Sequence, residues 1–362
     1  MQLSESRETP PFAGRALWIA AGVYVLARMV LHVFTAYGVF RDEFYYLDCA
    51  RHLAFGYVDQ PPLSIWILRV WTLVFGDSLI SIRIPPTLAH AATLLLVGRM
   101  TWRFGGGPIT QVAAAVLFTT APFIVALSSF YSMNAFDTLF WALVFYQLLR
   151  IVQEERPRDW LWLGVILGLG LLNKTSMLWL GFGLTMGMLL TPQRRWFMTP
   201  WPWTAAAIAF LLFSPYILWN MLNDWPTLEF MAGAREKLRD TPPWSLILDQ
   251  VLMFNPLAVL VWLSGLIGFF LVRSVQSYRI FGYTFLSVLT ILMLYGRARS
   301  YYLTPAFPPL FAFGAIWLQR RVSRSSKWVF PISAAVIVVF NLFFAPMGTP
   351  ILPPAGYIAY SE

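Results

Sequence analysis

Residues 159–190 read DWLWLGVILGLGLLNKTSMLWLGFGLTMGMLL. This stretch is apolar almost throughout. It is too long for a single crossing, because a bilayer core about 30 Å thick needs roughly 20 helical residues. Asn173 and Lys174 interrupt the stretch near its middle. We therefore expect two short membrane helices that meet at a turn, near 159–173 and 175–190.

The rest of the chain has the same character. Of its 362 residues, 58% are hydrophobic and only 12% are charged, about half of the charged share of a soluble domain. Apolar runs predict an all-α polytopic membrane protein with about eleven spans. The runs lie near 16–38, 79–103, 108–127, 133–152, 159–173, 175–190, 203–222, 246–272, 279–296, 301–319 and 328–345.

The charges orient these spans. The formal net charge is +9, and one set of predicted loops carries most of the arginines, such as Arg99, Arg150 and Arg195. The positive-inside rule places these loops in the cytoplasm, so the N-terminus is expected inside. Residues 1–346 are expected to form one transmembrane domain, and 347–362 a short outer tail without a separate soluble domain. No lysine-rich run or aromatic-interleaved basic patch indicates nucleic-acid binding.

The segment between the first two spans, residues 39–78, is the most informative. It contains RDEFYYLD at 41–48 and GYVDQPPL at 56–63, followed by a Trp-rich amphipathic helix at 64–75. Aromatic residues interleaved with charged ones are typical of helices that lie in the membrane interface. We expect an outer loop with interfacial helices that presents carboxylates just above the lipid.

Ionisable groups also occur at the outer ends of the spans. Asp42, Glu43 and Asp137 lie at or just inside apolar segments, where a charge is costly and usually paired or functional. Basic and tyrosine side chains are expected on the same face. These are Lys174, Arg297, Arg299, Tyr301 and Tyr302. Such a set suits a lipid phosphate, which ammonium, guanidinium and phenol groups can hold together.

Carboxylates beside a phosphate site predict group transfer from a phosphorylated lipid. If the transferred group is a sugar, the leaving phosphate needs charge stabilisation, which the cations provide. The acceptor hydroxyl needs a general base, which a carboxylate can supply.

Several motifs together resemble a known family. They are Asp42-Glu43, Tyr45-Tyr46, GYVDQPPL at 56–63, FGDS at 75–78 with RIP at 83–85, GLLNK at 170–174, PYILWN at 215–220 and YYLTP at 301–305. In order and spacing they are similar to those of the GT-C fold glycosyltransferases that use polyprenyl-phosphate sugars. The bacterial members of glycosyltransferase family 39 look closest, as relatives of the protein O-mannosyltransferases and the lipid A aminoarabinose transferase. The resemblance covers roughly residues 15–320.

The resemblance implies roles for individual residues. Asp42, with Glu43 beside it, is the implied catalytic base, and Lys174 is implied to contact the donor phosphate together with the junction from Arg297 to Tyr302. The implied substrate-binding residues are Asp59, Gln60, Asp137, Tyr45 and Tyr46. Relatives often carry a basic residue or histidine where this chain has Gln60, which argues against zinc. No cofactor is expected to be required, and a divalent metal stays an open alternative.

The resemblance also implies partners and a location. The donor would be an undecaprenyl-phosphate sugar, the acceptor a lipid, a glycan or a protein, and the transfer inverting. The site would face the periplasm in a bacterial inner membrane. The alternative is a lipid or solute carrier without chemistry. Against a carrier, the chain shows no internal repeat, and its polar groups crowd the outer ends instead of the midplane where carrier sites lie.

Overall fold

The computed structural model describes residues 10–35, 38–237, 240, 242–322, 326–349 and 351–361. Within these residues the regular structure is helical, without strands. The α-helices are α1 (Gly14–Phe34), α2 (Arg41–Arg51), α3 (Leu63–Phe75), α4 (Leu79–Arg103), α5 (Pro108–Thr119), α6 (Pro122–Leu127), α7 (Met133–Glu154), α8 (Asp159–Asn173), α9 (Met177–Leu189), α10 (Trp201–Leu222), α11 (Pro226–Lys237), α12 (Pro243–Met253), α13 (Val259–Leu271), α14 (Arg279–Tyr295), α15 (Pro308–Val322), α16 (Val329–Gly348) and α17 (Pro354–Ser361). The short 3-10 segments are η1 (Pro192–Met198), η2 (Pro256–Ala258), η3 (Arg273–Tyr278), η4 (Ser300–Tyr302) and η5 (Thr304–Ala306).

Six helical segments in the described chain are long and apolar enough to cross a membrane: α1, α4, α7, α10, η3 with α14, and α16. A seventh candidate is the pair formed by α12 and η2–α13, which is bent by 101°. The remaining predicted spans correspond to shorter helices, namely α5, α8, α9 and α15. The predicted break at Asn173-Lys174 is confirmed, because α8 ends at Asn173 and α9 begins at Met177.

Two predicted spans have helix boundaries that differ from those of their apolar runs. The run at 108–127 is divided at Pro122 into α5 and α6, and residues 300–306 form the 3-10 turns η4 and η5 instead of the start of a span. The prediction of a span beginning at 301 is wrong: its helix, α15, begins at Pro308. Pro122 and Pro308 lie in the first turn of the helix that follows, where a residue without an N–H breaks no helical hydrogen bond.

Close helix contacts hold the bundle together at small residues. α13 and α15 cross at Gly265 and Gly314, where a Cβ on Gly314 would lie 1.9 Å from the carbonyl oxygen of Val261. At Gly164, a Cβ would lie 2.6 Å from the carbonyl oxygen of Ala205 on α10. Such contacts are typical of membrane helices, which gain stability from backbone approach more than from the hydrophobic effect.

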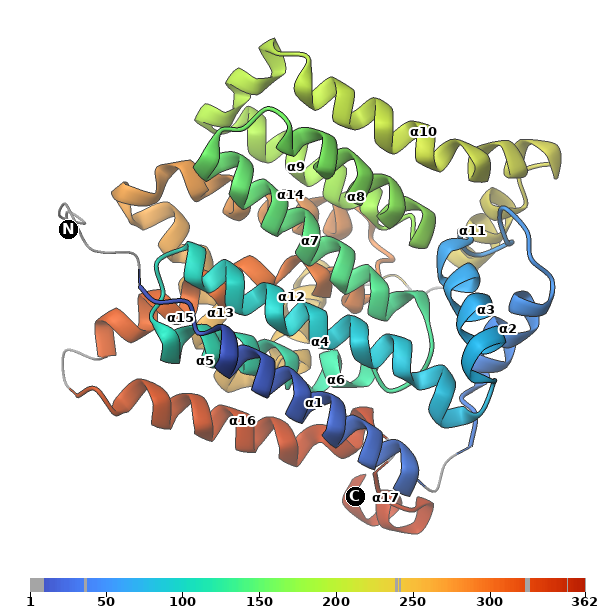
Figure 1. Cartoon of the computed structure of the whole chain (residues 1–362), viewed down its shortest axis with the longest axis horizontal. Coiled ribbons are helices and arrows are strands. Elements are labelled where there is room, and N and C mark those ends of the chain that lie inside the picture. The colour runs from blue at the N-terminus through green and yellow to red at the C-terminus, as the bar shows by residue number, and fades with distance from the viewer. Residues whose placement is uncertain are drawn as a thin grey trace.

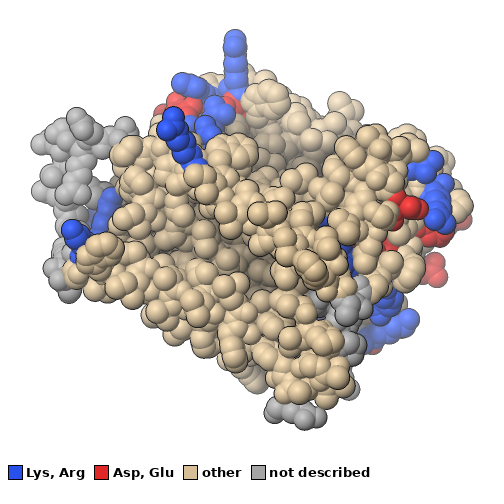
Figure 2. Space-filling view, turned by 60° about the horizontal axis from the view of Figure 1, so that its bottom comes forward, with Lys and Arg blue, Asp and Glu red and all other residues tan. Residues whose placement is uncertain are grey.

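The long helices run roughly side by side, and the interfacial elements gather at one end of them (Figure 1). There α2, α3 and α11 lie beyond the ends of α4 and α10, and α17 lies near the end of α1. On the face shown in Figure 2, a broad area between the two ends is almost free of charged residues, whereas lysine, arginine and acidic residues gather toward its edges. The protein surface exposes large apolar side chains such as Leu211 and Leu294, as expected for a protein embedded in lipid.

At the opposite end, ion pairs join α4, α7 and α8. Glu154 accepts contacts from Arg103 at 2.8 Å and Arg156 at 3.0 Å, and Arg150 pairs with Asp159 at 3.1 Å. This is the end that the arginine-rich loops predict to be cytoplasmic. The carboxylates of Asp42 and Asp137, in contrast, lie at the other end of the molecule, on α2 and at the start of α7.

Candidate active site

Residues 39–78, the predicted first outer loop, contain two helices, α2 and α3. α3 covers the predicted Trp-rich helix, and it ends at Gly76, whose φ of +77° is a conformation that favours glycine. The loop is docked on α10 at Gly56, where a Cβ would lie 2.3 Å from the indole of Trp219. Thr227, which begins the next outer segment, donates to the carbonyl oxygen of Tyr57 at 3.4 Å. The loop is thereby fixed to the bundle.

Glu43 lies in this loop and is fully buried. Its two carboxylate oxygens accept from Nε and Nη2 of Arg83 at 2.9 and 2.8 Å. They also accept from the backbone N–H groups of Tyr131 and Phe40 at 2.9 and 2.8 Å. This carboxylate is therefore surrounded by donors from α4 and from the segments before α2 and α7, and it has no face open to a substrate.

Asp42 precedes Glu43 on the same helix, and its side chain points in a different direction because successive residues are rotated by about 100°. Its side chain is 43% exposed, and its contact is with Arg41, whose Nε donates to Oδ1 at 3.1 Å. The charge of Asp42 acts on Asp59 and on the phenols of Tyr46 and Tyr301. Asp42 is thus the open carboxylate of the pair.

Asp59 and Tyr45 form a second polar contact in the loop. The Tyr45 hydroxyl donates to Oδ1 of Asp59 at 2.5 Å. Burial raises the pKa of Asp59, the hydrogen bond from Tyr45 opposes that rise, and the charge of Asp42 adds to it. Tyr46 is buried, and its hydroxyl accepts from the backbone N–H of Met133 at 3.0 Å.

Gln60 is fully buried, and neither atom of its amide has a hydrogen-bond partner in the described part of the chain. A buried amide left unpaired costs free energy, so Gln60 differs from the other polar residues of the loop. Ser64, one helical turn later, likewise has an unpaired hydroxyl.

Lys174 is the centre of the second charged cluster. Its Nζ donates to Asn134 Oδ1 at 2.8 Å and to Asp137 Oδ2 at 3.2 Å. Asp137 is buried, and its other oxygen accepts from the hydroxyl of Ser176 at 2.6 Å. An ammonium has three donors, so this arrangement leaves one N–H of Lys174 for a further acceptor.

Tyrosine rings cover Lys174. Its Nζ lies 5.4 and 5.5 Å from the ring centroids of Tyr301 and Tyr302, within the range of cation–π attraction. Burial raises the pKa of Tyr302 to about 12 and also raises that of Tyr301. Both phenols therefore stay protonated at neutral pH and can donate to an anion.

The structure separates the two arginines of the predicted junction. Arg299 is exposed, and its charge acts on Tyr301 and Tyr302. Arg297 instead pairs with Asp240, at 2.7 Å, in a pocket beside α11. The predicted set thus divides between the Lys174 cluster and this second pocket.

Sequence reasoning missed three residues. Arg83 belongs to the RIP motif, from which no role follows, and it is the partner of Glu43. Asn134 and Ser176 were not singled out, and both hydrogen-bond within the Lys174 cluster. Asn134 lies three residues before Asp137, on the same face of α7, and this spacing is a signal that the sequence offered. In the described residues no three His, Cys, Asp or Glu side chains converge as metal ligands.

Comparisons with known proteins agree with this architecture. Residues 59–219 match the family model of dolichyl-phosphate-mannose-protein mannosyltransferase. The lipid A galacturonosyltransferase RgtD of Rhizobium johnstonii is 28% identical over 206 residues, which are 57% of this chain and 43% of that protein. The undecaprenyl phosphate-alpha-4-amino-4-deoxy-L-arabinose arabinosyl transferase of Pseudomonas aeruginosa is 27% identical over 149 residues, covering 40% of this chain and 27% of that protein. The chain thus spans less than half the length of these curated relatives.

Solved structures establish the fold. ArnT from Cupriavidus metallidurans, in a crystal structure with undecaprenyl phosphate bound, superposes with a TM-score of 0.69 at 14% identity, over 95% of this chain and 76% of that one. The oligosaccharyltransferase of Archaeoglobus fulgidus gives a TM-score of 0.60 at 13% identity, over 97% of this chain and 56% of that one. The predicted all-helical GT-C architecture and the resemblance to glycosyltransferases of this kind are confirmed.

Proposed function

We propose that the protein is a membrane glycosyltransferase that moves a sugar from a polyprenyl-phosphate donor to a lipid, glycan or protein acceptor. The observation that carries this proposal is the buried ammonium of Lys174, which has one N–H to spare beneath two protonated tyrosines. A lipid phosphate suits such a site, because an anion gains most from a positive charge that is already removed from water. The names of the matching relatives, which are glycosyltransferases, support the same reading.

In this mechanism Asp42 is the general base. It accepts the proton of the acceptor hydroxyl while the oxygen attacks the anomeric carbon from the side opposite the phosphate. The bond between that carbon and the phosphate oxygen breaks, so the configuration inverts. The polyprenyl phosphate leaves with its negative charge balanced by Lys174 and by the hydroxyls of Tyr301 and Tyr302.

The other predicted site residues position the reacting groups or contact the substrates in the proposed mechanism. Glu43 is a positioning residue in this scheme, since Arg83 and two backbone N–H groups occupy its oxygens. Asp59 and Tyr45 face the substrate in this scheme, whereas Gln60 and Tyr46, which are buried, would act through the shape of the loop. Asp137 orients Lys174. Arg299 adds positive charge at the donor phosphate. No cofactor is required in this scheme, because Lys174, Arg299 and the two tyrosine hydroxyls stabilise the leaving phosphate; a divalent metal in that role stays the alternative.

The proposed setting is a bacterial inner membrane with the site on the periplasmic side and undecaprenyl phosphate as the lipid carrier. The arginine-rich ends of α4 and α7 support this orientation, because they lie opposite the loop that carries Asp42.

The test is transfer by the purified full chain in nanodiscs, given a panel of radiolabelled polyprenyl-phosphate sugars and a total membrane extract. We expect label in a new product, and a loss of about 10²–10⁴-fold in turnover for Asp42→Asn, the usual worth of a general base. Asp48→Asn is the matched control, because Asp48 lies on the same helix with a 73% exposed side chain. Full activity of Asp42→Asn would remove Asp42 as the base. If no member of the panel gives transfer or donor binding, the carrier alternative is favoured.

A further inference from the structure

A pocket of about 510 Å³ lies at the outer end of the bundle, between α11 and the end of α14. It is not part of the Lys174 cluster, but it is its neighbour. Tyr295, in the pocket wall, packs against Trp179 with ring centroids 6.2 Å apart. Trp179 lies in α9, five residues after Lys174 in the chain. The chain continues from Tyr295 through η4 to Tyr301. A molecule in this pocket would therefore lie beside the proposed site of transfer.

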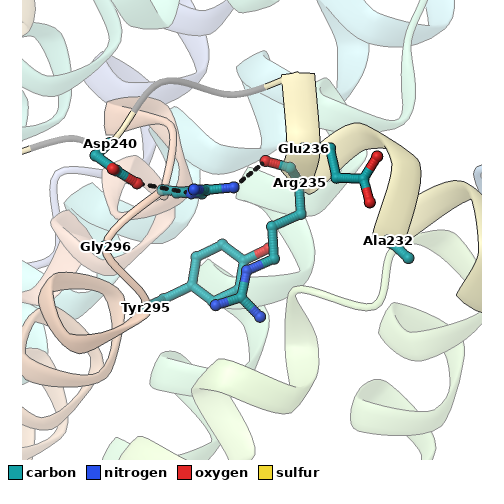
Figure 3. A pocket seen from close by; sticks show the side chains of 7 residues that line it. Ala232, Arg235, Glu236, Asp240, Tyr295 and Gly296 are labelled. Atoms are coloured by element: carbon teal, nitrogen blue, oxygen red, sulfur yellow. Dashed lines mark hydrogen bonds and ion pairs between the residues drawn. The ribbon is translucent and has the colours of Figure 1, made fainter.

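Arg297 forms a fixed wall of the pocket. Its Nε donates to Asp240 at 2.7 Å, and its Nη1 donates to the backbone carbonyl of Arg235 at 2.8 Å. Figure 3 shows both contacts, which tie the segment after α14 to the end of α11. The charge of Arg297 is thus largely balanced by Asp240.

Arg235 has a different environment. Its guanidinium lies over the ring of Tyr295, with Cζ 5.4 Å from the centroid (Figure 3). Among the contacts of the described residues, this guanidinium has no ion pair and no hydrogen bond. Stacking on an aromatic face leaves the N–H edge of an arginine free for a planar anion. Arg235 is also an exposed arginine on the outer face, where the positive-inside rule makes basic residues uncommon.

The lining indicates what kind of molecule fits. Apart from Ala232 and Gly296, each lining residue carries a charge or a tyrosine ring. A prenyl chain needs apolar walls, which this pocket does not provide. A saccharide suits it, because carboxylates such as those of Glu236 and Asp240 accept hydrogen bonds from hydroxyls, and an aromatic ring packs against the apolar face of a sugar.

We propose that this pocket binds an acidic saccharide of the acceptor, whose carboxylate or phosphate meets Arg235 and whose ring faces Tyr295. This inference rests on the proposed function and names the chemical class of the acceptor, an acidic saccharide. The pocket holds the acceptor headgroup on the outer side of the transfer site, while the donor phosphate lies at Lys174.

The test is direct binding to the full chain in nanodiscs of uncharged lipid, followed by saturation-transfer NMR. The probes are methyl glucuronide, methyl glucoside and acetate. Methyl glucoside has a hydroxymethyl group in place of the carboxylate, and acetate has the anion without the ring. We expect methyl glucuronide to bind about tenfold more tightly than either of the others, the effect of one charge-assisted hydrogen bond. Arg235→Gln should remove that preference, and Tyr295→Leu should weaken both sugars while Tyr295→Phe retains them.

Arg51→Gln is the matched control, since it removes one exposed positive charge from the same outer face outside the pocket. An equal loss in this variant, or acetate binding as tightly as methyl glucuronide, would overturn the proposal. Undecaprenyl phosphate binding is measured on the same samples. If wild type binds undecaprenyl phosphate but not methyl glucuronide, the pocket proposal fails alone; if it binds neither, the proposed function fails as well. If Arg235→Gln weakens undecaprenyl phosphate binding instead, the pocket belongs to the donor and the proposal is wrong.

Discussion

Two buried ion pairs lie at the outer end of the bundle, and they differ in how accessible the unused hydrogen-bond donors of their cations are. In the Glu43–Arg83 pair the carboxylate is 0% and the guanidinium 2% exposed, and two backbone N–H groups complete the carboxylate. In the Asp137–Lys174 pair the lysine side chain is 10% exposed, holds a single carboxylate oxygen at 3.2 Å, and lies beneath two tyrosine rings.

The difference teaches what each pair is for. The Glu43 carboxylate is filled by Arg83 and two backbone N–H groups. Nη1 of Arg83 has no partner among the described residues, but it is buried, so this pair joins α2, α4 and the start of α7. An ammonium with one N–H unused and aromatic rings around it is suited to receive an anion. A buried charge by itself does not mark a ligand site; an unfilled hydrogen-bond position that a ligand can reach does, and the Lys174 side chain is 10% exposed whereas that of Arg83 is 2% exposed.

The largest effect is expected from breaking the enclosed pair. Glu43→Ala leaves the Arg83 guanidinium buried without a counter-charge, so we expect a loss of about 3–5 kcal/mol in the free energy of unfolding. Denaturant titration in detergent measures it. Asp42→Ala, next in sequence but 43% exposed, is the control and should change stability by less than about 0.5 kcal/mol. Equal stability of the two variants would contradict the structural role of Glu43.

Substitutions in the Asp137–Lys174 pair are expected to change the affinity for undecaprenyl phosphate. Lys174→Met removes the proposed phosphate contact, so undecaprenyl phosphate should bind at least about tenfold more weakly. Because Lys174→Met also strands the Asp137 carboxylate, its stability falls too. The double variant Asp137→Asn with Lys174→Met removes both charges. We expect it to recover stability but not donor affinity, and recovery of both would exclude a role for Lys174 at the phosphate.

The smallest effect is expected at Asp59, a carboxylate that is only partly buried, whereas that of Glu43 is fully buried. Burial raises the pKa of Asp59 above its unfolded value, so its ionised form is disfavoured in the folded protein. This penalty is absent below the unfolded pKa and fully present above the folded one. Asp59→Asn should therefore have a higher Tm than wild type at neutral pH, with the gap closing as the pH falls. A gap that widens at acid pH would show that the folded protein favours the ionised carboxylate.

Part of the candidate site could be predicted from the sequence. Asp137 and Lys174 stand out because a charge inside an apolar run is rare, and the structure brings them within 3.2 Å. The sequence does not show which of Asp42 and Glu43 is buried. Helical rotation points two neighbouring side chains in different directions, but it does not determine which one faces the protein interior. Arg83 lies 40 residues from Glu43 in the chain, and no local pattern links them.

The sequence by itself determined that the chain is helical and embedded in lipid, because hydrophobic length and charge spacing are local properties. The break at Asn173-Lys174 followed from the same arithmetic. Only the tertiary structure decided which charges are satisfied, because hydrogen-bond partners come from distant helices. It placed Arg83 on Glu43, Asn134 on Lys174 and Asp240 on Arg297. It thereby distinguished a structural ion pair, a proposed phosphate site and a second pocket among residues of the same chemical types.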